Sequence, residues 1–212
     1  MIEIDEFNNE PFITLNSQGI KIREKWYQNG KLHRDGDKPA VIEYDEGNIT
    51  SECWFQHGKY HRDGDQPAWI EYNFNDERGI RKKWYQNGKL HRDGDKPAVI
   101  EYEGNITSEC WFQHNECHRD GDQPAWIKYV EGNITIQCYF KNGLKHRDGD
   151  QPAVINLFHE GKIQEWYQHG KLHRDGDQPA VIKLVHGGKI QEREWYQPVS
   201  YTHLTLPTKR IV

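Results

Sequence analysis

Six copies of the pentapeptide HRDGD hold most of the side chains in this 212-residue sequence that could do chemistry. Each copy places an imidazole and a guanidinium beside two carboxylates, groups that can bind a cation, exchange protons or form ion pairs. The copies begin at His33, His61, His91, His118, His146 and His173. An active site needs one constellation of residues, so a motif that returns six times favours a structural repeat.

Two fragments of this motif resemble functional signatures. HRD belongs to the catalytic loop of protein kinases, but the sequence has neither the downstream asparagine nor the DFG and glycine-rich elements. DGD resembles part of a calcium loop, yet each copy offers two carboxylates and lacks the later bidentate glutamate. We predict a structural turn, with no metal and no other cofactor. A metal- or calcium-loaded HRDGD ladder, in which neighbouring copies share an ion, stays open as an alternative function.

The spacing H-x3-H also recurs, and on a helix it could chelate zinc. Here it crosses a hairpin turn, which separates the two rings of each pair. We therefore predict that the motif histidines form a packing column against neighbouring aromatic residues, with a pH response as a secondary expectation. The pairs are His57 with His61, His114 with His118, and His169 with His173.

The four cysteines show no CxxC pair and no zinc-ligand spacing. Cys53, Cys110 and Cys138 share one repeat position, and Cys117 is the fourth. We interpret them as small, half-buried side chains in a reducing compartment.

An aromatic residue returns every 27 to 30 residues, seven positions before each motif histidine. Units of this length are typical of repeat proteins, in which each unit buries its apolar face only against its neighbours. We assign structural roles to these aromatic residues and to the motif histidines. The aromatic residues are Trp26, Trp54, Trp84, Trp111, Tyr139 and Trp166, followed by Trp195 at the start of an incomplete repeat.

Each aromatic residue opens a β-hairpin signal. In WYQNGKLH, Asn29 and Gly30 tolerate the positive φ of a two-residue primed turn. Counting outward from this turn sets Trp26 opposite His33. In the fourth repeat HNEC replaces HGKY, so Asn115 must take the turn position that glycine holds elsewhere.

The residues after each HRDGD loop alternate in character. In the first repeat, Ala40, Ile42 and Tyr44 form an apolar phase, while Val41 and Glu43 form a mixed phase. This period of two predicts a strand, and a glycine-containing turn such as DEGN leads into the next strand. No segment shows a sustained helical period.

We therefore predict an all-β fold, an elongated antiparallel β-hairpin repeat array of the meander or solenoid-like type, with about 28 residues per repeat. Residues 1–22 are an N-terminal half repeat and cap. Residues 23–197 hold the tandem hairpin repeats, six complete and a truncated seventh.

The last stretch of the sequence interrupts the seventh repeat. Residues 199–208, VSYTHLTLPT, lack the composition of the repeats and resemble the conceptual translation of a transposase-type sequencing adapter. We interpret residues 198–212 as a non-native adapter translation and leave them out of the fold prediction. On this interpretation the natural gene continues with further repeats.

Composition narrows the class of partner. The formal charge is −5, with lysine and arginine scattered among acidic residues, so no basic stripe is present and we expect no nucleic-acid partner. No apolar run reaches the roughly 18 residues of a spanning helix, and the N-terminal segment lacks a signal-peptide pattern. We expect no membrane insertion and a cytoplasmic location.

Trp69 and Trp126 are the candidate binding residues. They occupy the mixed-face position that valine fills in the other repeats, and large aromatic residues at variable surface positions are favoured binding anchors. A second layer that covers this face would explain them equally well, so both interpretations stay open.

We expect no enzymatic activity and assign no catalytic residue. An enzyme would need one unique constellation, and the irregular insertion NFNDERGI at residues 73–80 is the only candidate place. It contains no pair of nucleophile and base.

The pattern W-Y-x-N-G-K-x-H-R-D-G-D-x-P-A-V-I resembles the short β-hairpin repeats of the MORN-like superfamily, especially its bacterial and large-virus branch. The resemblance covers residues 11–197 and implies an extended β-sheet scaffold. MORN-type repeats are credited with protein or lipid contacts, and some members of this branch are described by similarity as antitoxins. The longer HRDGDKPA loop departs from the plain MORN glycine pattern, which argues against lipid binding.

These observations predict a non-catalytic repeat scaffold that mediates protein–protein interaction, with a partner that the sequence does not identify. An antitoxin-like binder of a toxin protein is a second alternative. The open ends of such a sheet could also pair end to end with another copy of the chain.

Overall fold

The structure is a computed structural model that describes residues 10–73, 76–185 and 187–196, with side chains described for all of these except 73–79. Every regular element in these residues is a β-strand, and hairpins recur about every 28 residues, which confirms the predicted all-β hairpin repeat array. The chain divides into two compact units, Met1–Cys117 and His118–Val212. The tail at 198–212 lies outside the described residues.

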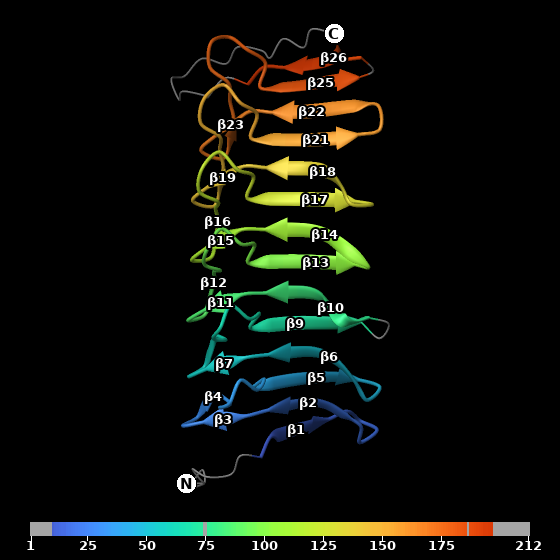
Figure 1. Cartoon of the computed structure of the whole chain (residues 1–212), viewed down its shortest axis with the longest axis vertical. Coiled ribbons are helices and arrows are strands. Elements are labelled where there is room, and N and C mark those ends of the chain that lie inside the picture. Colours follow the sequence, from blue (N-terminus) through green and yellow to red (C-terminus); the bar gives the residue numbers. More distant parts are fainter. Residues whose placement is uncertain (1–9, 74–75, 186, 197–212) are drawn as a thin grey trace. The chain divides into compact units, whose positions relative to one another are not determined.

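In the described part of the first unit, eight long strands form an antiparallel meander, each paired with the next long strand along the chain (Figure 1). They are β1 (Phe12–Leu15), β2 (Lys21–Lys25), β5 (Val41–Asp45), β6 (Asn48–Cys53), β9 (Trp69–Asn73), β10 (Asp76–Lys83), β13 (Val99–Glu103) and β14 (Asn105–Cys110). Short hairpins lie at one end of these strands. They are β3–β4 (Tyr27–Gln28, Lys31–Leu32), β7–β8 (Phe55–Gln56, Lys59–Tyr60), β11–β12 (Tyr85–Gln86, Lys89–Leu90) and β15–β16 (Phe112–Gln113, Glu116–Cys117).

The second unit repeats this plan in its described residues. Its long strands are β17 (Trp126–Val130), β18 (Asn133–Cys138), β21 (Val154–Phe158), β22 (Gly161–Glu165), β25 (Val181–Val185) and β26 (Lys189–Glu194). Its short hairpins are β19–β20 (Phe140–Lys141, Leu144–Lys145) and β23–β24 (Tyr167–Gln168, Lys171–Leu172).

The short hairpins form in the register that the turn residues predict. Asn29 and Gly30 have φ of 50° and 69°, as a primed turn requires, and β3 pairs with β4 accordingly. The backbone N–H of His33 donates to the carbonyl of Trp26 at 3.1 Å, which confirms that the two residues lie opposite each other. Asn115 takes the glycine position of the fourth turn with φ of 77°, also as predicted.

The HRDGD segment is a loop that returns the chain to the sheet. In the first repeat, Gly36 and Asp37 both have positive φ, 78° and 52°. Glycine adopts this conformation without steric cost, and aspartate is among the residues that tolerate it. The loop delivers Ala40, whose carbonyl accepts from the N–H of Trp26 at 2.9 Å and whose N–H donates to Cys53 at 2.8 Å.

Buried residues recur at two positions in each complete repeat. The alanine after each motif proline has no exposed surface, and the six aromatic residues of the complete repeats are 6–8% exposed. Side chains with no exposed surface are closely packed by their neighbours, and large aromatic side chains each bury an extensive area. The first strand is different, since Phe12, Ile13 and Leu15 are 65%, 55% and 54% exposed.

The apolar core reaches both faces of the sheet, which the sequence predicted only in part. Val41, on the predicted mixed face, is 7% exposed and packs with Cys53 and Phe55. The reason is that alternation continues from the long strand into the short hairpin, so Cys53 and Phe55 point to the same side. Hairpin side chains thereby cover one end of the mixed face.

Candidate binding surface

The arginine of the motif stacks on the aromatic residue of its own repeat. Guanidinium carbon and ring centroid are 3.6–3.9 Å apart, within range of a cation–π interaction. The stacked pairs are Arg34 on Trp26, Arg62 on Trp54, Arg92 on Trp84, Arg147 on Tyr139 and Arg174 on Trp166. The sequence did not indicate this contact, because the loop must fold back before the two residues meet.

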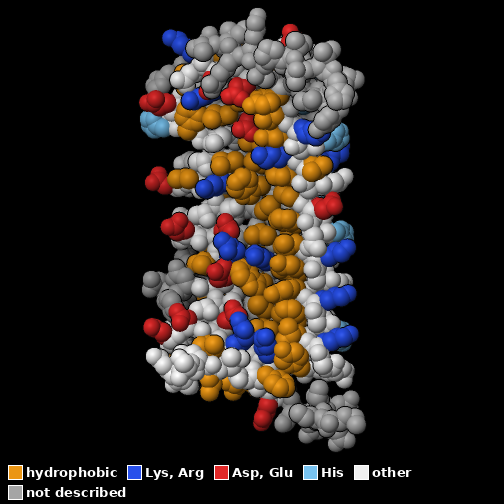
Figure 2. All heavy atoms as spheres, turned by 180° about the vertical axis from the view of Figure 1, so that it is seen from behind, with side chains coloured by type: hydrophobic (Ala, Val, Ile, Leu, Met, Phe, Trp, Pro, Cys, Tyr) orange, Lys and Arg blue, Asp and Glu red, His pale blue; other side chains and the backbone are white. Residues whose placement is uncertain are grey.

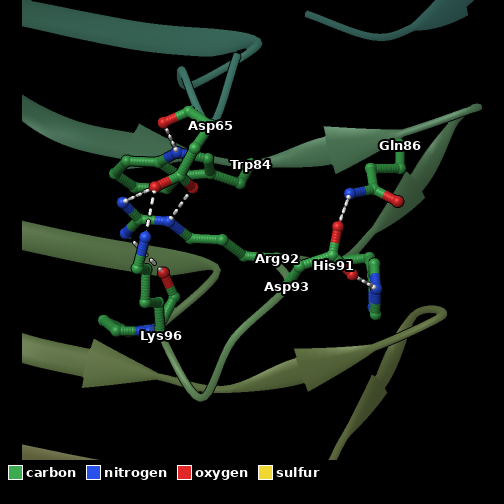
Figure 3. A network of polar contacts seen from close by, with 8 residues as sticks. Asp65, Trp84, Gln86, His91, Arg92, Asp93 and Lys96 are labelled. Atoms are coloured by element: carbon green, nitrogen blue, oxygen red, sulfur yellow. Dashed lines mark hydrogen bonds and ion pairs between the residues drawn. The ribbon is translucent and has the colours of Figure 1, made fainter. Parts of the chain in front are cut away.

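The same arginine joins its repeat to the preceding one, as Figure 3 shows for Arg92. Its Nη1 donates to the carbonyl of Pro97 at 3.2 Å. Its Nε and Nη2 donate to the carboxylate of Asp65, in the preceding loop, at 2.7 and 3.2 Å. This bidentate pair has the planar geometry that guanidinium and carboxylate favour. The motif arginine therefore links two consecutive repeats.

Asp65 receives a third donor. Lys96 Nζ lies 2.7 Å from Oδ2, and the indole N–H of Trp84 donates to the backbone carbonyl of Asp65 at 3.1 Å (Figure 3). The hydrogen bond from Arg92 lowers the pKa of the Asp65 carboxyl to about 2, against a smaller opposing effect of burial and with further help from Lys96. The second aspartate of the motif is thus held ionised by the next repeat.

Corresponding arginine–aspartate pairs occur in both units. In each of these pairs a hydrogen bond from the arginine is the largest cause that lowers the pKa of the aspartate. The pairs are Arg62 with Asp37, Arg147 with Asp122, and Arg174 with Asp150.

The motif histidine bridges its own loop and the next hairpin. His61 Nε2 lies 3.1 Å from Asp63 Oδ1, and the backbone N–H of Asn87 donates to His61 Nδ1 at 3.2 Å. Because an amide N–H can only donate, Nδ1 must be the acceptor and the proton resides on Nε2. His33, His118 and His146 make the same backbone contact. We call these arginine, histidine, aspartate and aromatic side chains of the HRDGD repeats the loop ladder.

The apex histidines do not pair within H-x3-H. Instead, the ring of His57 stacks on that of His33 in the preceding repeat, with centroids 4.7 Å apart. His114 stacks on His91 in the same way at 4.5 Å. Across the described residues, no three histidine, cysteine, aspartate or glutamate side chains gather in a way that could hold a metal ion. The charged groups of the loop ladder are largely engaged in contacts within and between repeats.

A second surface is formed by side chains of the long strands and the short hairpins. In the first unit, Leu32, Tyr60 and Trp69 pack against the buried cluster that contains Val41, Cys53 and Phe55. Tyr60 also stacks on Tyr85 of the next repeat, with centroids 4.8 Å apart. We call these seven residues, Leu32, Val41, Cys53, Phe55, Tyr60, Trp69 and Tyr85, the apolar band. Figure 2 shows hydrophobic side chains gathered between the hairpin edge and the charged middle of the sheet.

Trp69 is half-buried in this band. The ammonium of Lys83 lies 4.1 Å from its ring centroid, and burial is the main cause that lowers the pKa of Lys83. Trp126, at the matching position of the second unit, is half-buried too. The packing of Trp69 agrees with the interpretation of a covered face, while its remaining exposure leaves the binding prediction for both tryptophans open.

Charged side chains flank the apolar band on the sheet (Figure 2). Arg23 donates to Glu43 at 2.6 Å, and Arg81 donates to Glu71 at 3.2 Å and to Glu101 at 2.7 Å. These cross-strand pairs give the band a polar margin on the sheet. An apolar centre with a polar margin is the usual composition of a protein interface.

The second unit holds a separate shallow hollow of about 420 Å³. It lies where the turn after β21 meets the turn after β25, and its wall includes Leu157, His159 and Leu184. The insertion at residues 73–80, where an enzyme site was considered, lies almost wholly outside the described side chains.

Comparisons with protein-family models, with curated proteins and with solved structures find no match to this chain. In the part of the chain that the structure describes, no helix has the length and apolar character needed to cross a bilayer.

Proposed function

We propose that this chain is a non-catalytic repeat scaffold that binds a partner protein through the apolar band. The loop ladder is the weaker candidate for a binding surface, because its charged groups are largely paired within and between repeats. The band is the feature that carries the proposal. It joins apolar and aromatic side chains of neighbouring repeats in one strip, in which half-buried residues pack on a buried cluster and charged pairs form a polar margin.

The resemblance to MORN-like hairpin repeats agrees with a scaffold. Repeat sheets offer a surface that grows with each unit, so a partner can make many small contacts along it. Trp69 is the best candidate anchor in the band, since tryptophan is enriched among residues that contribute most to interfaces. An antitoxin-like role is one case of the same proposal, with a toxin protein as the partner.

Valine substitutions at the two tryptophans test the proposal and should preserve the fold. Val41 and Val99 occupy the positions that match Trp69 in neighbouring repeats, so Trp69→Val and Trp126→Val introduce residues that this fold already accepts. A partner is first isolated from the source cells with the unchanged chain, then purified and titrated by calorimetry. We expect the double variant to bind at least about tenfold more weakly.

The control is Glu103→Gln, at an exposed position at the end of β13. It should bind the purified partner as tightly as the unchanged chain. Equal affinity of the double tryptophan variant and of this control would contradict the assignment of the band as the binding surface.

A further inference from the structure

Two cysteines of the fourth repeat lie in contact. Cys110 ends β14 and Cys117 lies in β16, and their Sγ atoms are 3.5 Å apart. Both side chains are partly exposed, so a small reagent can reach them. A disulfide bond of about 2.05 Å requires the sulfurs to approach by about 1.5 Å.

Matching positions in other repeats lack this pair. In the second repeat Cys53 is buried, and Tyr60 stands where Cys117 stands in the fourth. Burial raises the pKa of the Cys53 thiol to about 12, which keeps it protonated and unreactive at neutral pH. In the fifth repeat Cys138 is 2% exposed and Lys145 takes the matching position. The chain therefore contains its own internal controls.

We propose that Cys110 and Cys117 form a dithiol site that small disulfides of the oxidised-glutathione class convert reversibly into an intramolecular disulfide. The thiolate of one cysteine attacks a sulfur of oxidised glutathione, forms a mixed disulfide and expels one glutathione thiolate. The thiolate of the other cysteine then attacks the protein sulfur of that mixed disulfide and expels the second. Two protein thiols thereby lose two protons and two electrons, and one glutathione disulfide becomes two glutathione thiols.

The product would tie the β15–β16 hairpin to the end of β14. Cysteine pairs that oxidise in this way act in cells as reversible, redox-responsive sites and differ from the permanent disulfides of secreted proteins. The site is independent of the proposed function, since its chemistry needs no partner protein.

The test uses the full chain, fully reduced and freed of reductant, then incubated with oxidised glutathione without oxygen. After an acid quench, the denatured protein is alkylated and its intact mass and peptides are measured. We expect two alkyl groups in place of four, and one linked peptide pair that contains Cys110 and Cys117. Four alkylated cysteines, a persistent glutathione adduct or a disulfide-linked dimer would each overturn the proposal.

Two variants sharpen this result. Cys117→Tyr gives the fourth repeat the residue that the second repeat has, and it should stop at a single glutathione on Cys110. Cys53→Ser should form the same cross-link as the unchanged chain. A cross-link that survives Cys117→Tyr, or one that disappears with Cys53→Ser, would show that a different pair reacts and would overturn the assignment.

Discussion

The loop ladder lies in the HRDGD loops and the aromatic residues before the hairpins, whereas the apolar band lies in the strands, and the two differ in how many of their groups are already engaged. In the ladder, Arg92 stacks on Trp84, binds Asp65 and reaches Pro97, so all its main groups are engaged. In the band, Trp69 and Tyr60 pack against buried neighbours but keep part of their surface in solvent. The difference separates the surface that holds the repeats together from the surface that can bind something else.

The comparison also explains why the most chemically suggestive motif is not the best candidate site. HRDGD carries charges and histidines, but these groups are largely engaged in contacts within and between repeats. Removing one of them should lower the stability, whereas replacing a half-buried band residue such as Trp69 should weaken binding more than stability. The predictions that follow test this contrast.

The largest expected effect comes from Arg92→Ala. The variant loses the stack on Trp84, the bidentate pair with Asp65 and the bond to the Pro97 carbonyl. We expect the free energy of unfolding to fall by about 2–3 kcal/mol, measured by urea denaturation. Arg92→Lys serves as the control and should recover only part of the loss, since lysine cannot bind bidentately. A loss below about 0.5 kcal/mol, which is the range of ordinary surface substitutions, would contradict the structural role of the ladder.

A smaller loss of stability is expected from Trp69→Val. The side chain is half-buried and valine occupies the matching positions of other repeats. We therefore expect the free energy of unfolding to fall by only about 1 kcal/mol. The same denaturation experiment gives this value. If Trp69→Val is more destabilising than Arg92→Ala, the assignment of stability to the ladder and of binding to the band is wrong.

Acid should weaken the ladder before it affects the band. The pKa of Asp65 is lowered to about 2 in the folded chain, so this carboxylate stabilises the fold above its ordinary pKa near 3.8. That contribution is lost as the pH falls through this interval, because the unfolded chain takes up the proton first. The midpoint temperature of thermal unfolding should therefore fall more steeply with decreasing pH for the unchanged chain than for Asp65→Asn. Parallel curves would contradict the linkage.

The smallest effect is spectroscopic and concerns the histidines. The backbone N–H of Asn87 donates to His61 Nδ1, so nitrogen NMR at neutral pH should find the Nε2–H tautomer for His61. Replacing Asn87 by glycine keeps the backbone donor and should preserve the tautomer. Observation of the Nδ1–H form would show that this link between repeats is absent.

Much of the local fold could be predicted from particular residues. Asn29 and Gly30 defined the turn, and the turn defined the register that sets Trp26 opposite His33. Asn115 was correctly placed at the one turn that lacks glycine. These features depend on neighbouring residues alone, so a single repeat contains the information needed.

Contacts between segments could not be predicted in the same way. The stack of Arg92 on Trp84 depends on how the loop folds back, and the covering of Val41 depends on where the hairpin side chains point. The contact between Cys110 and Cys117 was missed although one signal was present. Cys117 replaces the tyrosine that stands at the same distance after Cys53.

The central claim is that paired charges in the loop ladder couple neighbouring repeats. A double-mutant cycle on Asp37 and Arg62 tests it most directly. Asp65 also contacts Lys96, whereas the position that matches Lys96 beside the Asp37 pair is held by the uncharged Gln66. The cycle combines Asp37→Asn with Arg62→Gln and measures the coupling in the free energy of unfolding. We predict a favourable coupling of about 0.5–1 kcal/mol, reduced by the exposure of the aspartate. A coupling of zero within error would contradict the account.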